Sequence, residues 1–149
     1  MSVAFREARR EDVPTVVALL KDDVLGAGRE DEEVQTYHSA FEAMRAEGNN
    51  LLIVGEKDGQ IVATYQITFI SGLSLRASRR ANIESVRVAE TLRGERIGAA
   101  LIADAEARAR AAGCALMQLT MNAVRHDARR FYEQQGFLPS HVGFKRVLK

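Results

Sequence analysis

The spacing of hydrophobic and polar positions changes between strand-like and helix-like several times along the chain. Apolar residues two positions apart share one face of a strand, and those three or four apart share one face of a helix. The strand pattern is clearest at 51–56 and 60–70, which Asp58-Gly59 joins with a hairpin signal. Shorter strand-like stretches lie at 2–7, 82–88, 115–121 and 141–148, where Val142, Phe144 and Leu148 alternate with polar residues.

Four segments have the helical pattern. The first runs from Asp12 to about Leu25, and the second follows it and ends before Gly48. An alanine-rich third helix ends at Gly113, and a fourth spans 126–135. Three antiparallel strands in succession, followed by a strand, a helix and a strand, predict an α/β (α+β) fold with a mixed sheet.

The composition is that of a globular domain, because 46% of the 149 residues are hydrophobic and 28% are charged. We expect one domain over 1–149, since a chain of this length buries a core without a metal or disulfide. The single cysteine, Cys114, excludes an internal disulfide and indicates a reducing compartment. Without a long apolar run or a signal-peptide pattern, the predicted location is cytoplasmic. The scattered His38, His126 and His141 lack metal-ligand spacing, so we expect no metal.

The formal net charge of +1 conceals an uneven distribution. Residues 1–75 hold 7 Lys and Arg against 13 Asp and Glu, whereas residues 76–149 hold 14 against 7. Such an asymmetry indicates an anionic partner for the second half, or two halves that neutralise each other. The overall balance argues against a polybasic nucleic-acid-binding protein.

A strand-to-helix turn at 86–99 has the features of an anion site. The first N–H groups of a helix lack partners within it, and the helix dipole favours a negative charge there. Gly94 and Gly98 permit close backbone approach, and Arg93 and Arg96 add positive charge. The alternative is an ordinary turn with two solvated arginines.

Two further features are candidates for chemistry. The helix that begins at His126 carries Ala128, Phe131 and Tyr132 on one face, which is either packing or a site for the tyrosine. Glu84 lies inside a strand, and simple alternation places it on the same face as Val86 and Val88. Partial burial there would raise its affinity for protons and suit it to act as a general base; the alternative is a solvated position.

Together these features resemble the GNAT superfamily of N-acetyltransferases. The family pattern between a strand and a helix is Arg/Gln-x-x-Gly-x-Gly/Ala, and the corresponding run here begins at Arg93 and ends at Gly98 and Ala99. The downstream pattern is present as Ala128, Tyr132, Gly136 and Phe137. Arg96 replaces the middle glycine, which is tolerable if this residue has helical dihedral angles. Arg125 stands where the family often has asparagine, and Asn122 is the nearest asparagine.

The resemblance implies a fold, a co-substrate and a set of site residues. The fold is a mixed, mostly antiparallel sheet of about six to seven strands flanked by four helices. The co-substrate is acetyl-CoA, whose pantetheine would bind the backbone of Val86 and Val88 and whose diphosphate would bind the turn. Glu84 would be the general base and Tyr132 the general acid. The complete set implied for cofactor binding is Val86, Arg87, Val88, Arg93, Gly94, Glu95, Arg96, Ile97, Gly98, Ala99, Asn122 and Arg125.

The expected function is direct acetyl transfer to a primary amine of a small molecule. Acidic residues at 22–23 and 30–33 favour a cationic amine, whereas Arg76, Arg79 and Arg80 would suit an acidic group on the acceptor. An amino acid, amino phosphonate or amino phosphate combines both features. The alternatives are a protein or peptide N-acetyltransferase, with a wide groove, and a non-catalytic acyl-CoA-binding module. Neither a nucleic-acid partner nor a membrane is expected, and the last strand could pair in a homodimer.

Overall fold

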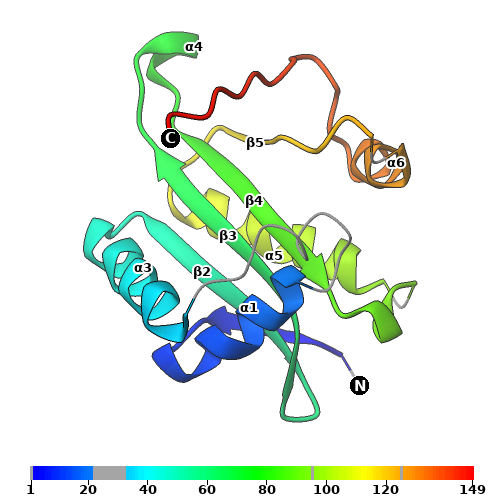
Figure 1. The fold of residues 1–149 in the computed structure, drawn as a ribbon. Coiled ribbons are helices and arrows are strands. Elements are labelled where there is room, and N and C mark those ends of the chain that lie inside the picture. The colour runs from blue at the N-terminus through cyan, green and yellow to red at the C-terminus, as the bar shows by residue number, and fades with distance from the viewer. Residues whose placement is uncertain (1, 22–32, 95, 125) are drawn as a thin grey trace.

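The computed structural model describes residues 2–21, 33–94, 96–124 and 126–149 (Figure 1). Its five strands are β1 (Ala4–Glu7), β2 (Asn50–Lys57), β3 (Gln60–Ile70), β4 (Arg80–Val88) and β5 (Leu116–Leu119). Its helices are α1 (Val13–Lys21), α3 (Val34–Glu47), α4 (Ser74–Ala77), α5 (Ile97–Ala111) and α6 (His126–Gln134), with short 3-10 turns η1 (Arg10–Asp12) and η2 (Glu90–Leu92).

One mixed sheet organises the fold, with the strand order β1-β2-β3-β4-β5. The first four strands are mutually antiparallel, and β4 and β5 run parallel. Asp58 and Gly59 both have positive φ, at 52° and 78°, as the tight hairpin between β2 and β3 requires. The predicted mixed α/β architecture is confirmed, although the described residues form five strands rather than six or seven.

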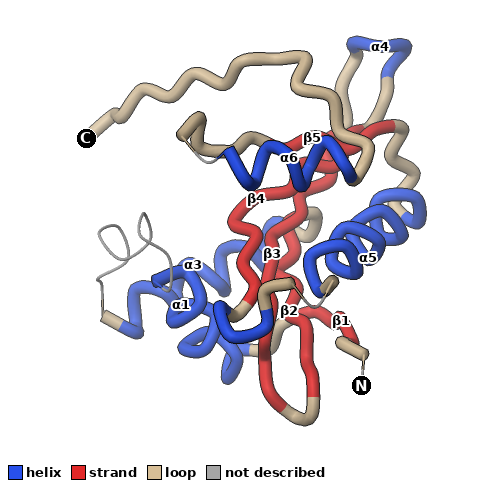
Figure 2. The backbone as a smooth tube through the Cα atoms, turned by 90° about the vertical axis from the view of Figure 1, so that its right-hand side faces the viewer, coloured by secondary structure: helices blue, strands red, loops and turns tan. Residues whose placement is uncertain are grey.

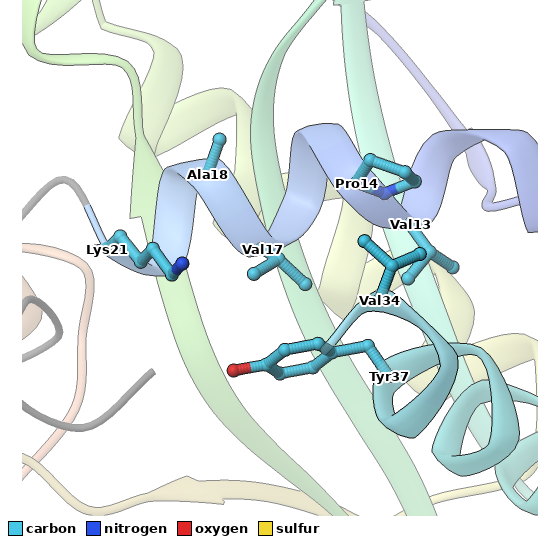
Figure 3. Close-up of a pocket in the computed structure, with 7 residues that line it drawn as sticks. All are labelled: Val13, Pro14, Val17, Ala18, Lys21, Val34 and Tyr37. Atoms are coloured by element: carbon cyan, nitrogen blue, oxygen red, sulfur yellow. The ribbon is translucent and has the colours of Figure 1, made fainter. Parts of the chain in front are cut away.

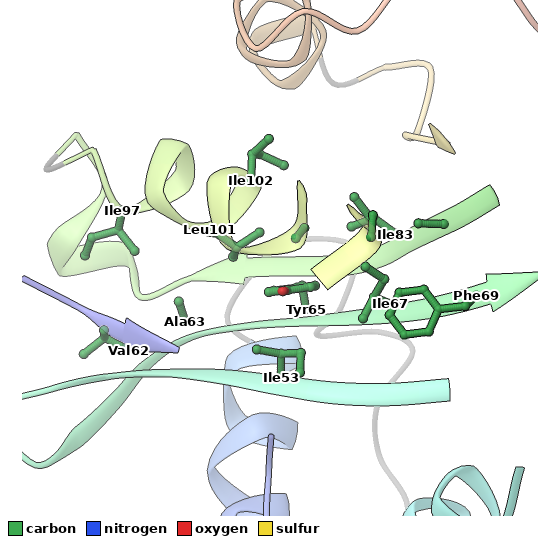
Figure 4. Packing of buried hydrophobic residues seen from close by; sticks show 13 residues of the cluster. Ile53, Val62, Ala63, Tyr65, Ile67, Phe69, Ile83, Ile97, Leu101 and Ile102 are labelled. Atoms are coloured by element: carbon green, nitrogen blue, oxygen red, sulfur yellow. The ribbon is translucent and has the colours of Figure 1, made fainter. Parts of the chain in front are cut away.

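The main core lies between the sheet and α5 (Figure 4). Ala63, Tyr65 and Ile67 alternate on the α5 face of β3 and are fully buried, as is Leu101 of α5. The buried Tyr65 hydroxyl donates to Asp104 Oδ2 at 2.5 Å. Burial and this neighbouring carboxylate raise the pKa of Tyr65 far above its ordinary value, so the phenol stays protonated and satisfied.

Helices α1 and α3 cover part of the opposite face (Figure 2). The buried residues of α1 are Val13, Val16 and Leu19, at the spacing of one helix face. Just before α1, Asp12 accepts hydrogen bonds from the Arg9 backbone N–H at 2.8 Å and from Arg6 at 2.7 Å. The Arg6 hydrogen bond holds the pKa of Asp12 below its ordinary value, so the carboxyl group stays ionised. Because Arg6 belongs to β1 and Asp12 immediately precedes α1, this contact links the start of α1 to β1.

Two segments differ from the sequence prediction. The stretch 71–81, between two predicted strands and without a predicted element of its own, contains the single turn α4, in which Leu75 and Arg76 have left-handed dihedral angles. Residues 141–148, which were expected to form a strand, form neither a helix nor a strand, and every residue in this stretch is exposed. A strand pattern requires a neighbouring strand for its backbone hydrogen bonds, and this chain does not place one there.

No helix in the described ranges is both long and apolar enough to span a bilayer.

Candidate active site

The site is built where β4 and β5 part. Their parallel ladder joins Arg80–Ile83 of β4 to Leu116–Leu119 of β5, and β4 then continues to Val88 paired with β3 but not with β5 (Figure 1). Along residues 84–88, the backbone edge of β4 that faced β5 is therefore no longer paired with β5. In α/β sheets, the carboxyl ends of parallel strands are the usual place for a ligand.

Ser85 forms a β-bulge in β4 at this divergence. Gln66 pairs with Glu84 and Thr64 pairs with Arg87, so β4 has two residues where β3 has one. Ser85 has a φ of 56°, in the left-handed region. An inserted residue of this kind breaks the two-residue alternation of the strand and bends it.

The bulge corrects the face predicted for Glu84. Paired residues share a face, and because Tyr65 points toward α5, Gln66 and Glu84 point to the face of α1 and α3. Val86 and Val88 instead pack against the core on the α5 side. Glu84 therefore does not share a face with the two valines, and it is exposed rather than partly buried.

The predicted anion turn leads into α5 as expected, with a difference at Arg96. Gly94 has a φ of 94°, and Arg96, the N-cap of α5, has a φ of 63° and a ψ of 16°. Arg96 is thus left-handed rather than helical, in a conformation that glycine adopts more easily. Arg93 and Arg96 are both exposed beside the first turn of α5. Exposed guanidinium groups at a helix N-terminus are well placed for a phosphate.

Gly98 has a packing role that the sequence did not reveal. A Cβ atom at this position would lie 3.0 Å from the Phe131 ring of α6. The glycine therefore lets α6 approach the first turn of α5, in addition to any closeness to a ligand.

Two backbone carbonyls of β4 accept hydrogen bonds from arginine side chains. Arg87 Nη1 donates to the Val86 carbonyl at 2.9 Å, and Arg93 Nε donates to the Val88 carbonyl at 3.3 Å. These are the two residues whose backbone the family resemblance assigns to pantetheine. A ligand amide that binds either carbonyl would therefore compete with an arginine that lies nearby.

Tyr132 lies in the second half of α6. Its ring makes edge contacts with Phe131 and Phe137, with centroid distances of 5.2 and 6.0 Å. The three rings pack against the core on the α5 side of the sheet. Tyr132 and Glu84 are thus held on opposite sides of the sheet, and the divergence of β4 and β5 lies between them.

The remaining predicted residues have varied positions. Ile97 is buried in the core, and Ala99 is half-buried in the first turn of α5. Asn122 Oδ1 accepts from the Val124 backbone N–H at 3.1 Å, so it stabilises the turn before α6. Glu95, Arg125 and the acidic positions 22–23 and 30–32 lie outside the described residues.

A row of polar side chains beside Glu84 was missed by the sequence analysis. Asn50, Thr68, Asn82 and Gln118 are paired in turn across β2 to β5, on the α1 and α3 face. Asn50 Oδ1 accepts from Gln66 and Thr68, and Gln118 Nε2 donates to Asn82 Oδ1 at 3.4 Å. The sequence pattern that could have revealed this row is the alternation of the polar Thr64, Gln66 and Thr68 with apolar residues along β3. These amides give the Glu84 face hydrogen-bonding capacity for a polar acceptor.

The three arginines predicted to suit an acidic group on the acceptor, Arg76, Arg79 and Arg80, lie at or before the start of β4. Arg79 donates to Ser71 Oγ at 2.8 Å and stacks on Phe69, and Arg80 lies beside Gly72. Arg80 precedes Glu84 by four positions in β4, which is about 13 Å between their Cα atoms. On the Glu84 face, Arg87 is nearer, since it pairs with Thr64 on that face.

A separate apolar pocket of about 200 Å³ lies between α1 and α3 (Figure 3). Its lining is mostly aliphatic, with Lys21 and Tyr37 at one side. None of its seven lining residues carries a carboxylate, thiol or imidazole, and the pocket is distinct from the divergence of β4 and β5.

Comparison with known proteins identifies the family. Residues 5–137 match the family model described as Acetyltransferase (GNAT) family. Over 144 residues, the chain is 30% identical to an aminoalkylphosphonate N-acetyltransferase from Salmonella typhimurium (strain LT2), with 97% of this chain and 90% of that protein covered. The chain therefore belongs to the GNAT acetyltransferase family.

Solved structures have the same fold. A protein from Bacillus halodurans C-125, named a transcriptional regulator, is 43% identical with a TM-score of 0.93, over 98% of this chain and 99% of that one. A protein from Clostridium acetobutylicum described as a predicted acetyltransferase, solved with acetyl-CoA, is 20% identical with a TM-score of 0.76, over 98% and 96%. Family membership makes this chain an acyltransferase, and the family uses acetyl-CoA.

Substituting Arg96 should separate backbone strain from ligand binding. Arg96→Gly should raise the free energy of unfolding by about 1 kcal/mol, because glycine adopts a positive φ without strain. It should also raise the KM for acetyl-CoA about tenfold, through loss of a charge-assisted hydrogen bond. Denaturant unfolding and initial rates measure the two effects.

Arg96→Ala is the matched control, since it removes the charge but keeps a side chain at positive φ. It should raise the KM by a similar factor without the gain in stability. An unchanged KM in both variants would exclude a phosphate contact at Arg96.

Proposed function

We propose that the protein transfers the acetyl group of acetyl-CoA directly to a primary amine of a small molecule. The observation that carries the proposal is the opening between β4 and β5, with Glu84 on one side of the sheet and Tyr132 on the other. This arrangement allows the thioester and the amine to approach from opposite faces. Direct transfer needs both reactants at one point, which such an opening supplies.

Each chemical step has a candidate group. Glu84 takes the proton from the ammonium, directly or through a water, so that the free amine attacks the thioester carbonyl carbon. The backbone N–H of Val86 stabilises the oxyanion that develops on the carbonyl oxygen. When the carbon–sulfur bond breaks, the Tyr132 hydroxyl gives its proton to the departing thiolate. The turn that contains Arg93, Gly94 and Arg96, together with the first residues of α5, binds the diphosphate.

We infer further that the acceptor carries an anionic group near its amine. The relative from Salmonella is named for aminoalkylphosphonates, which combine an amine and a phosphonate. The register places Arg87 on the Glu84 face, as it does Arg80 at the start of β4, and the polar row on that face can bind further oxygen atoms. The side chain of Arg87 therefore serves the acceptor, while the backbone on either side of it serves the co-substrate.

The proposal also covers the organisation of the molecule. We take residues 1–149 as a single N-acetyltransferase domain that works in the cytoplasm, where one half-buried thiol, Cys114, stays reduced. We also propose that the protein works as a homodimer.

The test is a thiol-release assay with acetyl-CoA across amino phosphonates, amino acids, polyamines and peptides. We expect turnover with small anionic amines, and Arg87→Ala should raise their KM about tenfold while the KM of a neutral amine stays constant. Arg110→Ala is the control, because Arg110 is exposed on α5 and pairs with Glu106.

Other outcomes are equally informative. A higher kcat/KM for peptides than for free amines would favour a protein acetyltransferase. Tight CoA binding without thiol release for any acceptor would overturn the enzymatic proposal and favour an acyl-CoA-binding module.

A further inference from the structure

Glu84 has a cross-strand partner, Gln66 of β3, that has no role in the proposed chemical steps. The two residues pair across β3 and β4, and both side chains lie on the face of α1 and α3. Directly opposed side chains of antiparallel strands have Cβ atoms about 4.5–5.5 Å apart. Gln66 is half-buried and Glu84 is exposed, so a small molecule bound at the carboxylate lies within reach of the amide. An amide has one accepting end and one donating end, and its orientation decides which of them the small molecule meets.

The orientation of the Gln66 amide follows from hydrogen bonds that begin at Glu47, the last residue of α3. Asn50 Nδ2 donates to Glu47 Oε1 at 2.7 Å. Because a carboxylate only accepts hydrogen bonds, Asn50 must turn its NH2 group to Glu47, and its carbonyl oxygen is then free to accept elsewhere. That oxygen accepts from Gln66 Nε2 at 2.8 Å and from Thr68 Oγ1 at 3.3 Å. The NH2 group of Gln66 is therefore directed to Asn50.

The carbonyl oxygen of Gln66 consequently faces away from Asn50. Asn50 belongs to β2 and Glu84 to β4, which flank β3 on its two sides (Figure 1). No group in the described part of the chain donates a hydrogen bond to Gln66 Oε1 or to the Glu84 carboxylate. Gln66 and Glu84 thus present two acceptors side by side to the space above the sheet.

Two neighbouring acceptors fit a ligand group that carries several donors, and a primary ammonium carries three N–H groups. We propose that the Gln66 carbonyl oxygen is a second amine-binding group of the site, which accepts one N–H of the acceptor while Glu84 takes the proton of another. Glu47 and Asn50 act through Gln66 as positioning residues. The inference rests on the proposed function for the identity of the acceptor.

The contact with Gln66 would orient the nitrogen for attack. After Glu84 has taken one proton, the neutral amine keeps two N–H groups and gains a lone pair. A hydrogen bond from one of these N–H groups to Gln66 Oε1 restricts rotation about the carbon–nitrogen bond of the amine. The lone pair is then held in one direction, which lowers the entropic part of the barrier to attack on the thioester.

Gln66→Met tests the contact, because methionine keeps the length of the side chain but removes both amide atoms. With 2-aminoethylphosphonate as the acceptor, we expect the KM of the amine to rise about tenfold while the KM of acetyl-CoA stays constant. The fall of kcat/KM at low pH should remain, because Glu84 is intact. Gln60→Met is the matched control, since Gln60 is exposed at the hairpin end of the same strand, and it should leave both KM values unchanged.

Two substitutions of Asn50 separate orientation of the amide from packing. Asn50→Leu removes the oxygen that holds the Gln66 NH2 group, so the amide can turn and the KM of the amine should rise about three- to tenfold. Asn50→Asp keeps an acceptor for Gln66 Nε2 and should keep this KM within about twofold of the wild type. An equal rise of the KM in both variants would mean that Asn50 does not act by orienting Gln66.

Calorimetry in the presence of CoA measures the same contact without turnover. The two probes are 2-aminoethylphosphonate and its N-trimethyl analogue, which keeps the positive charge but has no N–H group. The ratio of their dissociation constants should be about tenfold smaller in Gln66→Met than in the wild type.

An unchanged ratio in Gln66→Met would overturn the inference, as would a wild-type KM for the amine in this variant. A wild type that binds both probes equally, or binds neither, would overturn it as well. Absence of thiol release with every amine would overturn only the enzymatic proposal, because the two dissociation constants still test the contact with Gln66.

Discussion

Glu84→Gln should reduce the kcat of acetyl transfer by about 100-fold or more, within the range for loss of general-base catalysis. The amide keeps the shape of the side chain but cannot accept a proton from the ammonium. Since Glu84 is exposed on the sheet face and lies outside the core, the variant should fold normally. The measurement is kcat/KM against pH for wild type and variant, with the best acceptor from the panel.

The pH profile distinguishes a base from a binding group. In the wild type, kcat/KM should fall at low pH, and this acid limb should be absent in the variant. Glu106→Gln, at an exposed position of α5, removes the same charge and should leave the profile unchanged. Tyr132→Phe should lower kcat ten- to 100-fold without removing the acid limb, because it affects the leaving group. An acid limb that survives in Glu84→Gln would exclude Glu84 as the base.

Leu101→Ala should lower the free energy of unfolding by about 3 kcal/mol, the typical cost of a cavity in a packed core. Leu101 is fully buried between α5 and the sheet, among other buried side chains of the core (Figure 4). The midpoint of thermal unfolding should fall by roughly 10 °C for a chain of this size. The substitution should also disturb the candidate site, because the turn proposed to bind the diphosphate leads directly into α5.

Leu73→Ala is the matched control for this cavity. Leu73 is 92% exposed, so the same truncation there should change the free energy of unfolding by less than about 0.5 kcal/mol. A Leu101 variant as stable as this control would mean that the core between α5 and the sheet is not packed as described.

Local patterns predicted most elements of the fold. Asp58-Gly59 specified the hairpin because its positive φ values are available to few residue pairs. The apolar alternation of β3 predicted its buried face, since burial of Tyr65 and Ile67 follows from their spacing. The turn from Arg93 to Ala99, with the pattern around Tyr132, predicted the family, and the family match confirms it.

The sequence by itself determined the family, the mixed sheet and the residue types available for acid–base chemistry. These are consequences of spacing and motif, which act over a few neighbouring residues. Only the tertiary structure decided which faces those residues occupy. The bulge at Ser85 arises from pairing with β3, and it moved Glu84 to the side opposite Val86 and Val88. Residues 141–148 likewise have the sequence pattern of a strand but do not form one, because a strand needs a neighbouring strand for its backbone hydrogen bonds.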